Sequence, residues 1–327
     1  GPYVSATGQN ITIAAEGLVQ VPNPLYNPAD PVPAPRLITR DYGFGAVPGT
    51  VTINGTPLQN VIWTAGSISG TVASGTTTGE LRITRGDNGF SSLVGVTVTV
   101  GDANGRSPIQ VAPGGSIQNA IDMAQSNDLI LVPPGRYDQL PIVWKPVRLQ
   151  GWGAGSTIIN ATKAPAEKLV AWRAKVQALV TSGVVDLLPG QAVGGGTGNE
   201  PGLLNTEEGA GILVLSKNAT PLNGGFGDAP NARIDGFTIT GADHGGGIFV
   251  NGYARFLEIS NNHVVNNAGF YGGGIRIGHP ADTLAGVDAQ NDFITIHHNH
   301  IAENGGQGNA GGGISINWYA EPTISNC

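Results

Sequence analysis

Cysteine, methionine and charged residues are scarce in this chain of 327 residues. It contains one cysteine, Cys327, and one methionine, and only 12% of its residues are charged, against about 25% in ordinary soluble domains. A single cysteine excludes an internal disulfide framework and any zinc site built on several cysteines. No apolar run approaches the roughly 18 residues that a transmembrane segment requires.

Positive charge is also in short supply. Lys and Arg number 16 against 23 Asp and Glu, which gives a net charge of −7. The chain therefore lacks the excess of basic residues that binds nucleic acid or anionic membranes, and neither is expected as a partner. Low charge combined with abundant Gly, Asn and Thr is typical of secreted bacterial surface proteins, so we expect an extracellular or cell-surface location.

The chain is instead rich in glycine, and the glycines repeat. Three segments place Gly-Gly-Gly before an aliphatic, a variable and a second aliphatic residue: HGGGIFV (244–250), YGGGIRI (271–277) and AGGGISI (310–316), with GAGILVL (209–215) as a weaker copy. Such repeats indicate a solenoid whose coils stack about 4.8 Å apart. We expect each triple glycine to form a corner before a strand whose two aliphatic side chains enter the core. No Lys-Ser or Lys-Thr follows any copy, which argues against a phosphate-binding loop.

A second element repeats between the glycine corners. IDGFTI (234–239), ISNNHV (259–264), IHHNHI (296–301) and ISNC (324–327) align with one another. The alignment predicts that Asn262 and Asn299 stack as a ladder, with Cys327 next in line as a corner or inward thiol without a catalytic role. Because the last copy stops at its fourth residue, we expect further β-helix sequence, or another chain, at the C-terminal end.

The first hundred residues have a different pattern. Residues 1–37 are predicted to form a strand pair followed by a proline-rich linker. Residues 38–101 contain five β-branched runs separated by Gly, Ser and Asn-Gly turns, which predicts a small antiparallel sandwich. The segments DYGFGAVPGTVTINGTPL, VIWTAGSISGTV and SSLVGVTVTV in this region resemble the IPT/TIG family of immunoglobulin-like domains. The resemblance implies a spacer or binding module without catalysis.

From residue 108 the sequence again changes character. Ser116 is a good helix N-cap, and Ile117, Ala120, Ile121 and Ala124 follow at helical spacing. The stretch PGGSIQNAIDMAQSNDLILVPPGRYDQ, with VRLQGWGAGSTIINA after it, resembles the start of the pectate-lyase-like β-helix superfamily. This resemblance implies a right-handed parallel β-helix over 108–327 with a helix over its N-terminal end. It does not define the chemistry, because that superfamily includes lyases, hydrolases, esterases, epimerases and adhesins.

Residues 165–188 interrupt the β pattern. Leu169, Trp172, Val176 and Leu179 lie on one helical stripe, which predicts an amphipathic helix packed on the outside of the coil. The predicted fold is therefore all-β: a small Ig-like sandwich, then a right-handed parallel β-helix with an inserted α-helix.

Charged and aromatic residues near the glycine corners are the candidates for ligand binding. Exposed rings stack on sugars, and a few charged groups orient a polar ligand. No catalytic residue is assigned, because the motifs of polygalacturonases and the calcium-binding Asp series of pectate lyases are absent. The predicted ligand-binding residues are Asp243, His244, Arg255, Arg276, His279, Trp318 and Tyr319.

The segment HHNH (297–300) is the strongest suggestion of a metal site. Alternate residues of a strand share a face, so His298 and His300 could converge with His263 of the neighbouring coil. No acidic residue is obviously placed as a third ligand, and exposed imidazoles in a polar ladder explain the pattern more simply. No cofactor is expected; calcium or a His-bound divalent metal is kept as the weaker alternative.

Two functions remain after this comparison. The favoured one is an extracellular scaffold or adhesin whose long flat faces bind a polysaccharide or a surface protein. The alternative is a polysaccharide-active enzyme, a lyase or glycoside hydrolase, acting on an outer face of the β-helix. Low charge and the missing motifs favour the first.

Overall fold

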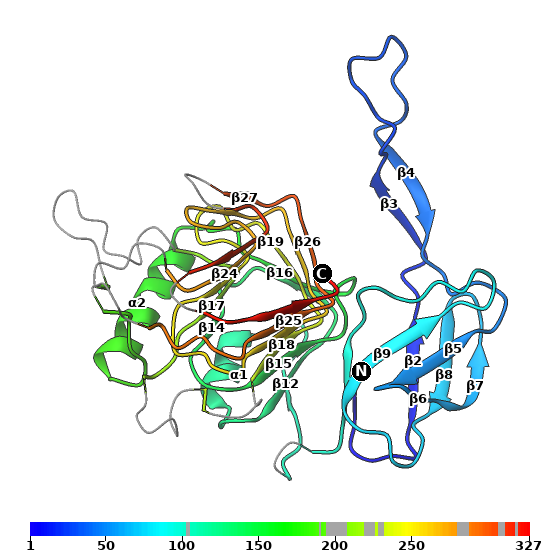
Figure 1. The fold of residues 1–327 in the computed structure, drawn as a ribbon, viewed down its shortest axis with the longest axis horizontal. Coiled ribbons are helices and arrows are strands. Elements are labelled where there is room, and N and C mark those ends of the chain that lie inside the picture. The colour runs from blue at the N-terminus through cyan, green and yellow to red at the C-terminus, as the bar shows by residue number, and fades with distance from the viewer. Residues whose placement is uncertain are drawn as a thin grey trace. The chain divides into compact units, whose positions relative to one another are not determined.

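Contacts divide the chain into two units in the computed structural model, which describes residues 1–102, 105–189, 191–193, 208–218, 226–227, 232–279, 288–306, 311–317 and 320–327. Unit 1 comprises Gly1, Tyr3–Ser92 and Val98–Gly101, and unit 2 comprises Pro2, Leu93–Thr97 and Asp102–Cys327. Unit 1 is drawn in blue and cyan, and unit 2 mostly from green to red (Figure 1). Both are built mainly from strands, which confirms the predicted all-β class.

Unit 1 consists of small sheets around an aliphatic core of buried residues that include Val51, Ile53 and Ile68. A five-stranded sheet has the order β1-β10-β9-β5-β6, and a three-stranded sheet has the order β2-β8-β7. Each of the five predicted β-branched runs overlaps one of these strands. The strands are β1 (Tyr3–Val4), β2 (Asn10–Ala14), β5 (Thr50–Ile53), β6 (Thr56–Pro57), β7 (Gln59–Trp63), β8 (Ser67–Thr71), β9 (Gly79–Thr84) and β10 (Thr97–Val100).

The N-terminal residues are arranged differently from the expected separate strand pair. Strand β2 pairs antiparallel with β8, and β1 pairs parallel with β10, so residues 3–14 complete the sheets of unit 1. The physical reason is that alternating Ile11 and Ile13 need a partner sheet to cover them. The proline-rich segment lies between β3 (Leu18–Pro22) and β4 (Leu37–Asp41), which pair with each other as an antiparallel hairpin.

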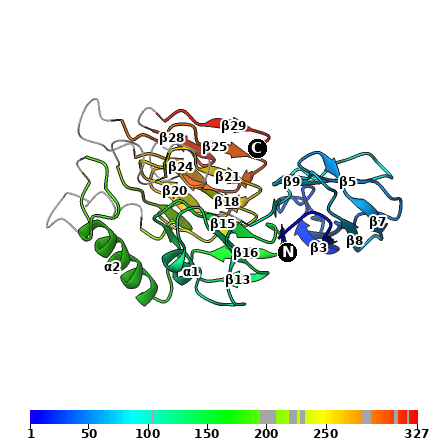
Figure 2. The same cartoon turned by 90° about the horizontal axis from the view of Figure 1, so that it is seen from below.

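Unit 2 contains three parallel sheets stacked as in a β-helix (Figures 1 and 2). Each coil contributes one strand to each sheet, and a further short pair joins β23 (Ala268–Gly269) to β27 (Gly305–Gly306). The seven-stranded sheet comprises β11 (Ile109–Gln110), β12 (Leu129–Val132), β15 (Arg148–Gly151), β18 (Arg233–Asp235), β21 (Glu258–Ser260), β25 (Thr295–His297) and β29 (Thr323–Ser325). The second sheet comprises β13 (Gly135–Tyr137), β16 (Thr157–Asn160), β19 (Thr238–Thr240), β22 (His263–Val265) and β26 (His300–Ala302). The third sheet comprises β14 (Ile142–Val143), β17 (Ile212–Val214), β20 (Ile248–Val250), β24 (Ile275–Ile277) and β28 (Ile314–Ile316).

The strand registers confirm both repeat alignments. In the seven-stranded sheet Ile234, Ile259, Ile296 and Ile324 are successive partners. In the third sheet the first aliphatic residue after each glycine corner pairs with its counterpart in the next coil. These ladders of identical or similar side chains form the interior, and most of their members are fully buried. The third-sheet partners are Ile212, Ile248, Ile275 and Ile314.

The glycine corners are places where neighbouring coils approach too closely for a side chain. Gly246 has φ +77°, and a Cβ on it would lie 2.5 Å from the carbonyl oxygen of Gly272. A Cβ on Gly274 would lie 2.2 Å from the carbonyl oxygen of Gly313. Real Cβ atoms do not approach backbone oxygens so closely, so glycine is required for the coils to stack. The predicted role of the triple glycine as a corner is confirmed.

Asparagines stack at a second corner, as expected for Asn262 and Asn299. The amide Nδ2 of Asn262 donates to Oδ1 of Asn299 at 3.0 Å and to the carbonyl of Ile234 at 3.0 Å. The thiol of Cys327 follows next in this column and is exposed. A second ladder, which the sequence comparison had not singled out, joins Asn267 to Asn304. Both ladders satisfy backbone groups that the turns leave without a sheet partner.

Both helices occur where they were predicted. Helix α1 (Ile117–Met123) begins after Ser116, whose side chain accepts a hydrogen bond from the backbone of Asn119, and its buried face joins the coil interior. Helix α2 (Glu167–Thr181) buries Trp172, Val176 and Leu179 against outward-facing residues of the third sheet. It lies along the outside of the coil (Figure 2). Within the described residues, neither helix combines the length and apolarity needed to cross a bilayer.

Candidate functional site

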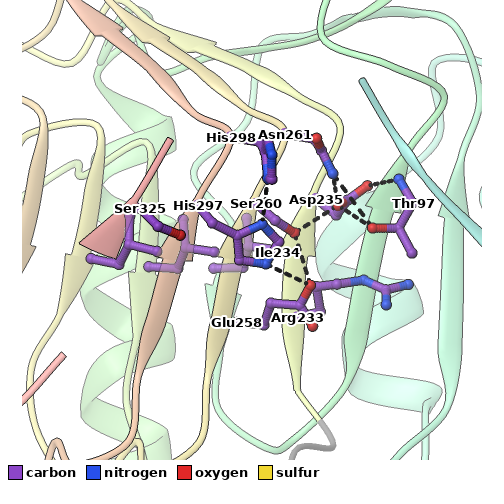
Figure 3. Close-up of polar contacts among 12 residues, drawn as sticks. Thr97, Arg233, Ile234, Asp235, Glu258, Ser260, Asn261, His297, His298 and Ser325 are labelled. Atoms are coloured by element: carbon purple, nitrogen blue, oxygen red, sulfur yellow. Dashed lines mark hydrogen bonds and ion pairs between the residues drawn. The ribbon is translucent and has the colours of Figure 1, made fainter. Parts of the chain in front are cut away.

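The outer face of the seven-stranded sheet gathers polar and charged side chains from successive coils (Figure 3). Since strand residues alternate between faces, the residues on either side of each buried isoleucine point outward. They form two columns along the sheet. The first column is Arg148, Arg233, Glu258, Thr295 and Thr323, and the second is Gln150, Asp235, Ser260, His297 and Ser325.

Asp235 is fully buried and has a structural role. Its carboxylate accepts hydrogen bonds from the backbone and hydroxyl of Thr97 at 2.9 and 2.7 Å, and from Ser260 and Asn261 at 2.7 and 2.9 Å (Figure 3). A carboxylate has about four acceptor positions, so these four donors occupy its capacity. Gln150 also donates to the carbonyl of Thr97. The carboxylate therefore holds the segment Leu93–Thr97 of unit 2 on the sheet.

Glu258, His297 and His298 form a hydrogen-bonded chain on the same face (Figure 3). Nε2 of His297 lies 3.2 Å from Oε1 of Glu258, and Nδ1 of His297 lies 2.9 Å from Nδ1 of His298. An ionised Glu258 can only accept, so Nε2 of His297 carries the proton. When His297 is neutral, its Nδ1 accepts from Nδ1 of His298.

The pKa of Glu258 reflects this environment. Burial alone would raise the pKa of Glu258, but hydrogen bonds from His297 and Ser260 and the positive charges of Arg233 and His297 outweigh it. The pKa of Glu258 therefore lies below its ordinary value. The glutamate remains a carboxylate at neutral pH and fixes the orientation of His297, rather than acting as a proton donor.

Two arginines lie side by side in the first column. Arg148 and Arg233 are register partners on adjacent strands. Arg233 donates to Oε1 of Gln150 at 2.9 Å, whereas Arg148 makes no side-chain hydrogen bond or ion pair to a described residue. Burial, followed by the like charge of Arg233, lowers the pKa of Arg148. The charge of Glu258 opposes that shift in Arg148 and also interacts with Arg233. Arg148, which lacks a hydrogen-bonded partner among the described residues, is therefore the guanidinium placed to receive an anion.

The residues predicted near the glycine corners fall into two groups. His244 packs against Phe270, Phe270 against Tyr271, and Tyr271 against His279, with ring centroids 4.7 to 5.9 Å apart. Arg276 lies on β24 with its guanidinium 3.5 Å from the ring centroid of Phe249, and it is fully buried.

Asp243 forms an exposed ion pair with Lys163 at 2.7 Å. Arg255 follows β20, whereas Asp243 and His244 precede it, so the strand separates Arg255 from them. Arg255 instead pairs with Asp292 at 3.1 Å and lies over the ring of Phe293. Trp318 and Tyr319 lie outside the described residues. Ligand binding by this predicted set stays a prediction.

The three histidines of the metal hypothesis do not converge on one side. His263 and His300 are register partners on the second sheet with ring centroids 5.3 Å apart. His298 lies at the preceding corner with φ +53°, and its ring packs against His297. The chain turns between His298 and His300, so the alternation assumed for a continuous strand does not hold. In the part of the chain that the structure describes, no group of three or more His, Cys, Asp or Glu residues could hold a metal ion.

The two outer columns were not predicted from the sequence, although the pattern that identifies them is present in it. Each residue immediately before an aligned isoleucine belongs to the first column, and each residue immediately after it belongs to the second. Thus RID, EIS and TIH give Arg233 and Asp235, Glu258 and Ser260, and Thr295 and His297. No protein-family model, curated protein or solved structure matches this chain.

Proposed function

We propose that this chain is an extracellular or cell-surface β-helix that binds an anionic polysaccharide through the outer face of its seven-stranded sheet. The resemblances to IPT/TIG domains and to the pectate-lyase-like right-handed β-helix are part of the same proposal. Unit 1 would then be a spacer or binding module, and unit 2 the main binding body. A polysaccharide is favoured over a protein because the stacked coils repeat about every 4.8 Å along the sheet, as a polymer repeats its units.

The observation that carries the proposal is the arginine pair. Arg148 lies next to Arg233 and makes no side-chain hydrogen bond or ion pair to a described residue, and Glu258, which follows Arg233 in the column, is hydrogen-bonded to His297. A carboxylate or sulfate at the guanidinium of Arg148 would offset the repulsion from the buried Arg233 and form charge-assisted hydrogen bonds. The exposed hydroxyls of Thr323 and Ser325 continue the two columns as neutral contacts for sugar hydroxyls.

The pairing of the carboxylates favours binding over catalysis. Asp235 is occupied by four donors, Glu258 is bonded to His297, and Asp292 is paired with Arg255. A hydrolase requires one carboxyl group to protonate the leaving group and a second to act as base or nucleophile. On the described part of the outer face, these acids are engaged by protein groups instead.

Affinity electrophoresis or biolayer interferometry with immobilised polygalacturonate and neutral dextran tests the proposal. We expect binding to polygalacturonate but not to dextran, with the affinity falling as salt rises. Arg148→Gln should weaken binding at least about tenfold, because it removes a charge-assisted contact. Arg82→Gln, which removes the same charge from an exposed position in unit 1, should leave it unchanged.

Equal binding to dextran, or equal losses in both variants, would contradict the anionic site. The same incubations also address the enzymatic alternative. Unsaturated products or new reducing ends above a boiled control would replace the non-catalytic proposal by a lyase or hydrolase.

A further inference from the structure

A separate pocket lies on the other side of the coil, between helix α2 and the start of the third sheet. It has a volume of about 240 Å³, somewhat smaller than the roughly 300–1,000 Å³ of sites for drug-sized ligands. A space of this size suits a single ring with its substituents. All of its lining residues belong to unit 2, so the pocket does not depend on the placement of unit 1.

The pocket has an apolar floor. Leu140, Pro141 and Ile142 line it from the chain leading into β14, and Trp172 lines it from α2. Trp172 is 4% exposed, and its buried Nε1 donates to no described group. An apolar floor beside an aromatic ring is the surface on which the C–H face of a sugar packs.

Positive charge predominates around this floor. Lys168 and Lys175 both line the pocket from α2, and Lys145 lies 4.1 Å from the ring centroid of the neighbouring Trp144. The acidic groups are already compensated: Asp122 accepts from Lys175 at 2.8 Å, and Asp138 accepts from Arg136 at 3.1 Å. Among the residues that line the pocket, the cations Lys168 and Lys175 outnumber the single carboxylate, Asp138, by one.

Each of the two pocket lysines has N–H donors that are not hydrogen-bonded to a described residue. An ammonium group has three N–H donors. Among described residues, Lys168 donates only to the carbonyl of Thr162, and Lys175 only to Asp122. Burial lowers the pKa of Lys168, and the charge of Asp138 opposes that shift. An anion arriving at Lys168 would compensate the buried charge.

Hydroxyl partners are also present at the pocket. The carboxylate of Asp138 lines it as an acceptor, and the hydroxyl of Ser116 lines it as a donor, since its oxygen already accepts from the backbone of Asn119. A ligand that combines a carboxylate, hydroxyl groups and an apolar ring face satisfies all of these groups at once. A plain fatty or aromatic acid would leave the hydroxyl of Ser116 without a ligand partner.

We propose that this pocket binds a single acidic sugar residue, with its carboxylate at Lys168 and its ring on the floor formed by Leu140, Ile142 and Trp172. The site goes beyond the polymer-binding face proposed above, because it lies on a different side of the coil and recognises one residue. The contact between Lys168 and the carboxylate of the ligand, together with the apolar floor, defines the class of ligand.

NMR titration of the ¹⁵N-labelled full chain tests this site, with the indole N–H signal of Trp172 assigned from a Trp172→Phe variant. The probes are galacturonate and galactose, which differ only in the carboxylate. We expect galacturonate to shift the Trp172 signal with a Kd on the order of 1 mM, and galactose to bind at least about tenfold more weakly.

Two variants separate the site from general charge effects. Lys168→Gln should weaken galacturonate binding at least about tenfold, whereas Lys217→Gln, on an exposed pair with Asp186 away from the pocket, should leave the Kd unchanged. Both variants should keep the wild-type melting temperature, which shows that the comparison concerns binding.

Several results would overturn the proposal. These are equal shifts with galactose, no saturable shift with galacturonate, or a Kd that Lys168→Gln leaves unchanged. The outcome of the galacturonate titration does not depend on the polymer-binding face. Arg148→Gln should leave the galacturonate titration intact, and Lys168→Gln should leave polygalacturonate binding intact, so failure of one site does not imply failure of the other.

Discussion

The outer faces of the seven-stranded sheet and the third sheet are built by the same coils but have opposite characters. In the third sheet the outward residues of the first three strands, Ile142, Leu213 and Phe249, are apolar and pack against α2, and Arg276 and Ser315 follow them in the column. In the seven-stranded sheet the outward positions hold Arg, Glu, Ser and His, which bond to one another. The interior ladders are equally aliphatic in both. The inward residues and the corners are therefore similar in every coil, whereas the outward positions differ from one face to the other.

The largest expected difference between the two faces is in stability. Leu213→Ala should lower the free energy of unfolding by about 2–5 kcal/mol, because it leaves a cavity beneath α2. Thr295→Ala, at an outward position of the other sheet, should change it by less than about 1 kcal/mol. Urea unfolding followed by circular dichroism measures both. Similar losses in the two variants would mean that α2 does not pack on the third sheet as described.

Within the polar face, Asp235 should be by far the most important carboxylate for stability. Asp235→Ala leaves the buried donors of Thr97, Ser260 and Asn261 unsatisfied, and we expect a loss of about 3 kcal/mol. Asp243→Ala removes a carboxylate from an exposed ion pair and should cost less than about 1 kcal/mol. The same unfolding measurement applies. A small effect at Asp235 would contradict its role in holding Leu93–Thr97.

In the second sheet, His263 should make the stability of the protein depend on pH. Burial, followed by the charge of His300, lowers the pKa of His263 to about 4. The unfolded chain therefore binds this proton more readily, and stability should fall as the pH drops from about 6.5 towards 4. We expect His263 to account for a loss on the order of 2 kcal/mol in that window.

Unfolding midpoints measured at pH 7 and pH 4.5 test this expectation. His263→Gln should remove its share of the pH dependence. His300→Gln should retain most of it, because burial is the larger cause of the shift. Equal pH dependence in wild type and His263→Gln would place the acid sensitivity elsewhere.

The smallest expected effect on stability is at the arginine pair. Arg148→Gln relieves a like-charge contact with Arg233, so we expect the free energy of unfolding to stay within about 0.5 kcal/mol of wild type. Thermal unfolding at low and high salt checks this. A clear loss of stability would show that Arg148 is a structural residue, and would weaken its assignment to ligand binding.

Much of the fold could be predicted from repeats of short sequence elements. The Gly-Gly-Gly corners, the aligned isoleucines and the stacking of Asn262 on Asn299 all follow from the same requirement, that identical positions meet in successive coils. The amphipathic stripe of α2 was also visible, because Trp172, Val176 and Leu179 keep helical spacing. These features are local or periodic, and a pattern in the sequence can express them.

The candidate site could be predicted only in part. His244 and His279 were singled out by residue type, but Arg148 and Arg233 were not, since 84 residues separate two side chains that are partners on adjacent strands. Similarly, the expected convergence of His298 with His300 assumed a continuous strand, and the corner between them turns the chain. Residue type alone does not indicate which face a side chain occupies after a turn.

By itself the sequence determined the class of fold, the positions of the helices and the residues that fill the interior. Inward positions must be aliphatic in every coil and corners must be glycine or asparagine, so these requirements repeat and are visible in one dimension. The tertiary structure decided what the outward positions do. The pairing of Arg148 with Arg233, the saturation of Asp235 and the lysine pocket beside α2 each depend on which strands become neighbours. Insertions of unequal length separate the partner strands along the chain, so these neighbours become evident only when the coils are aligned.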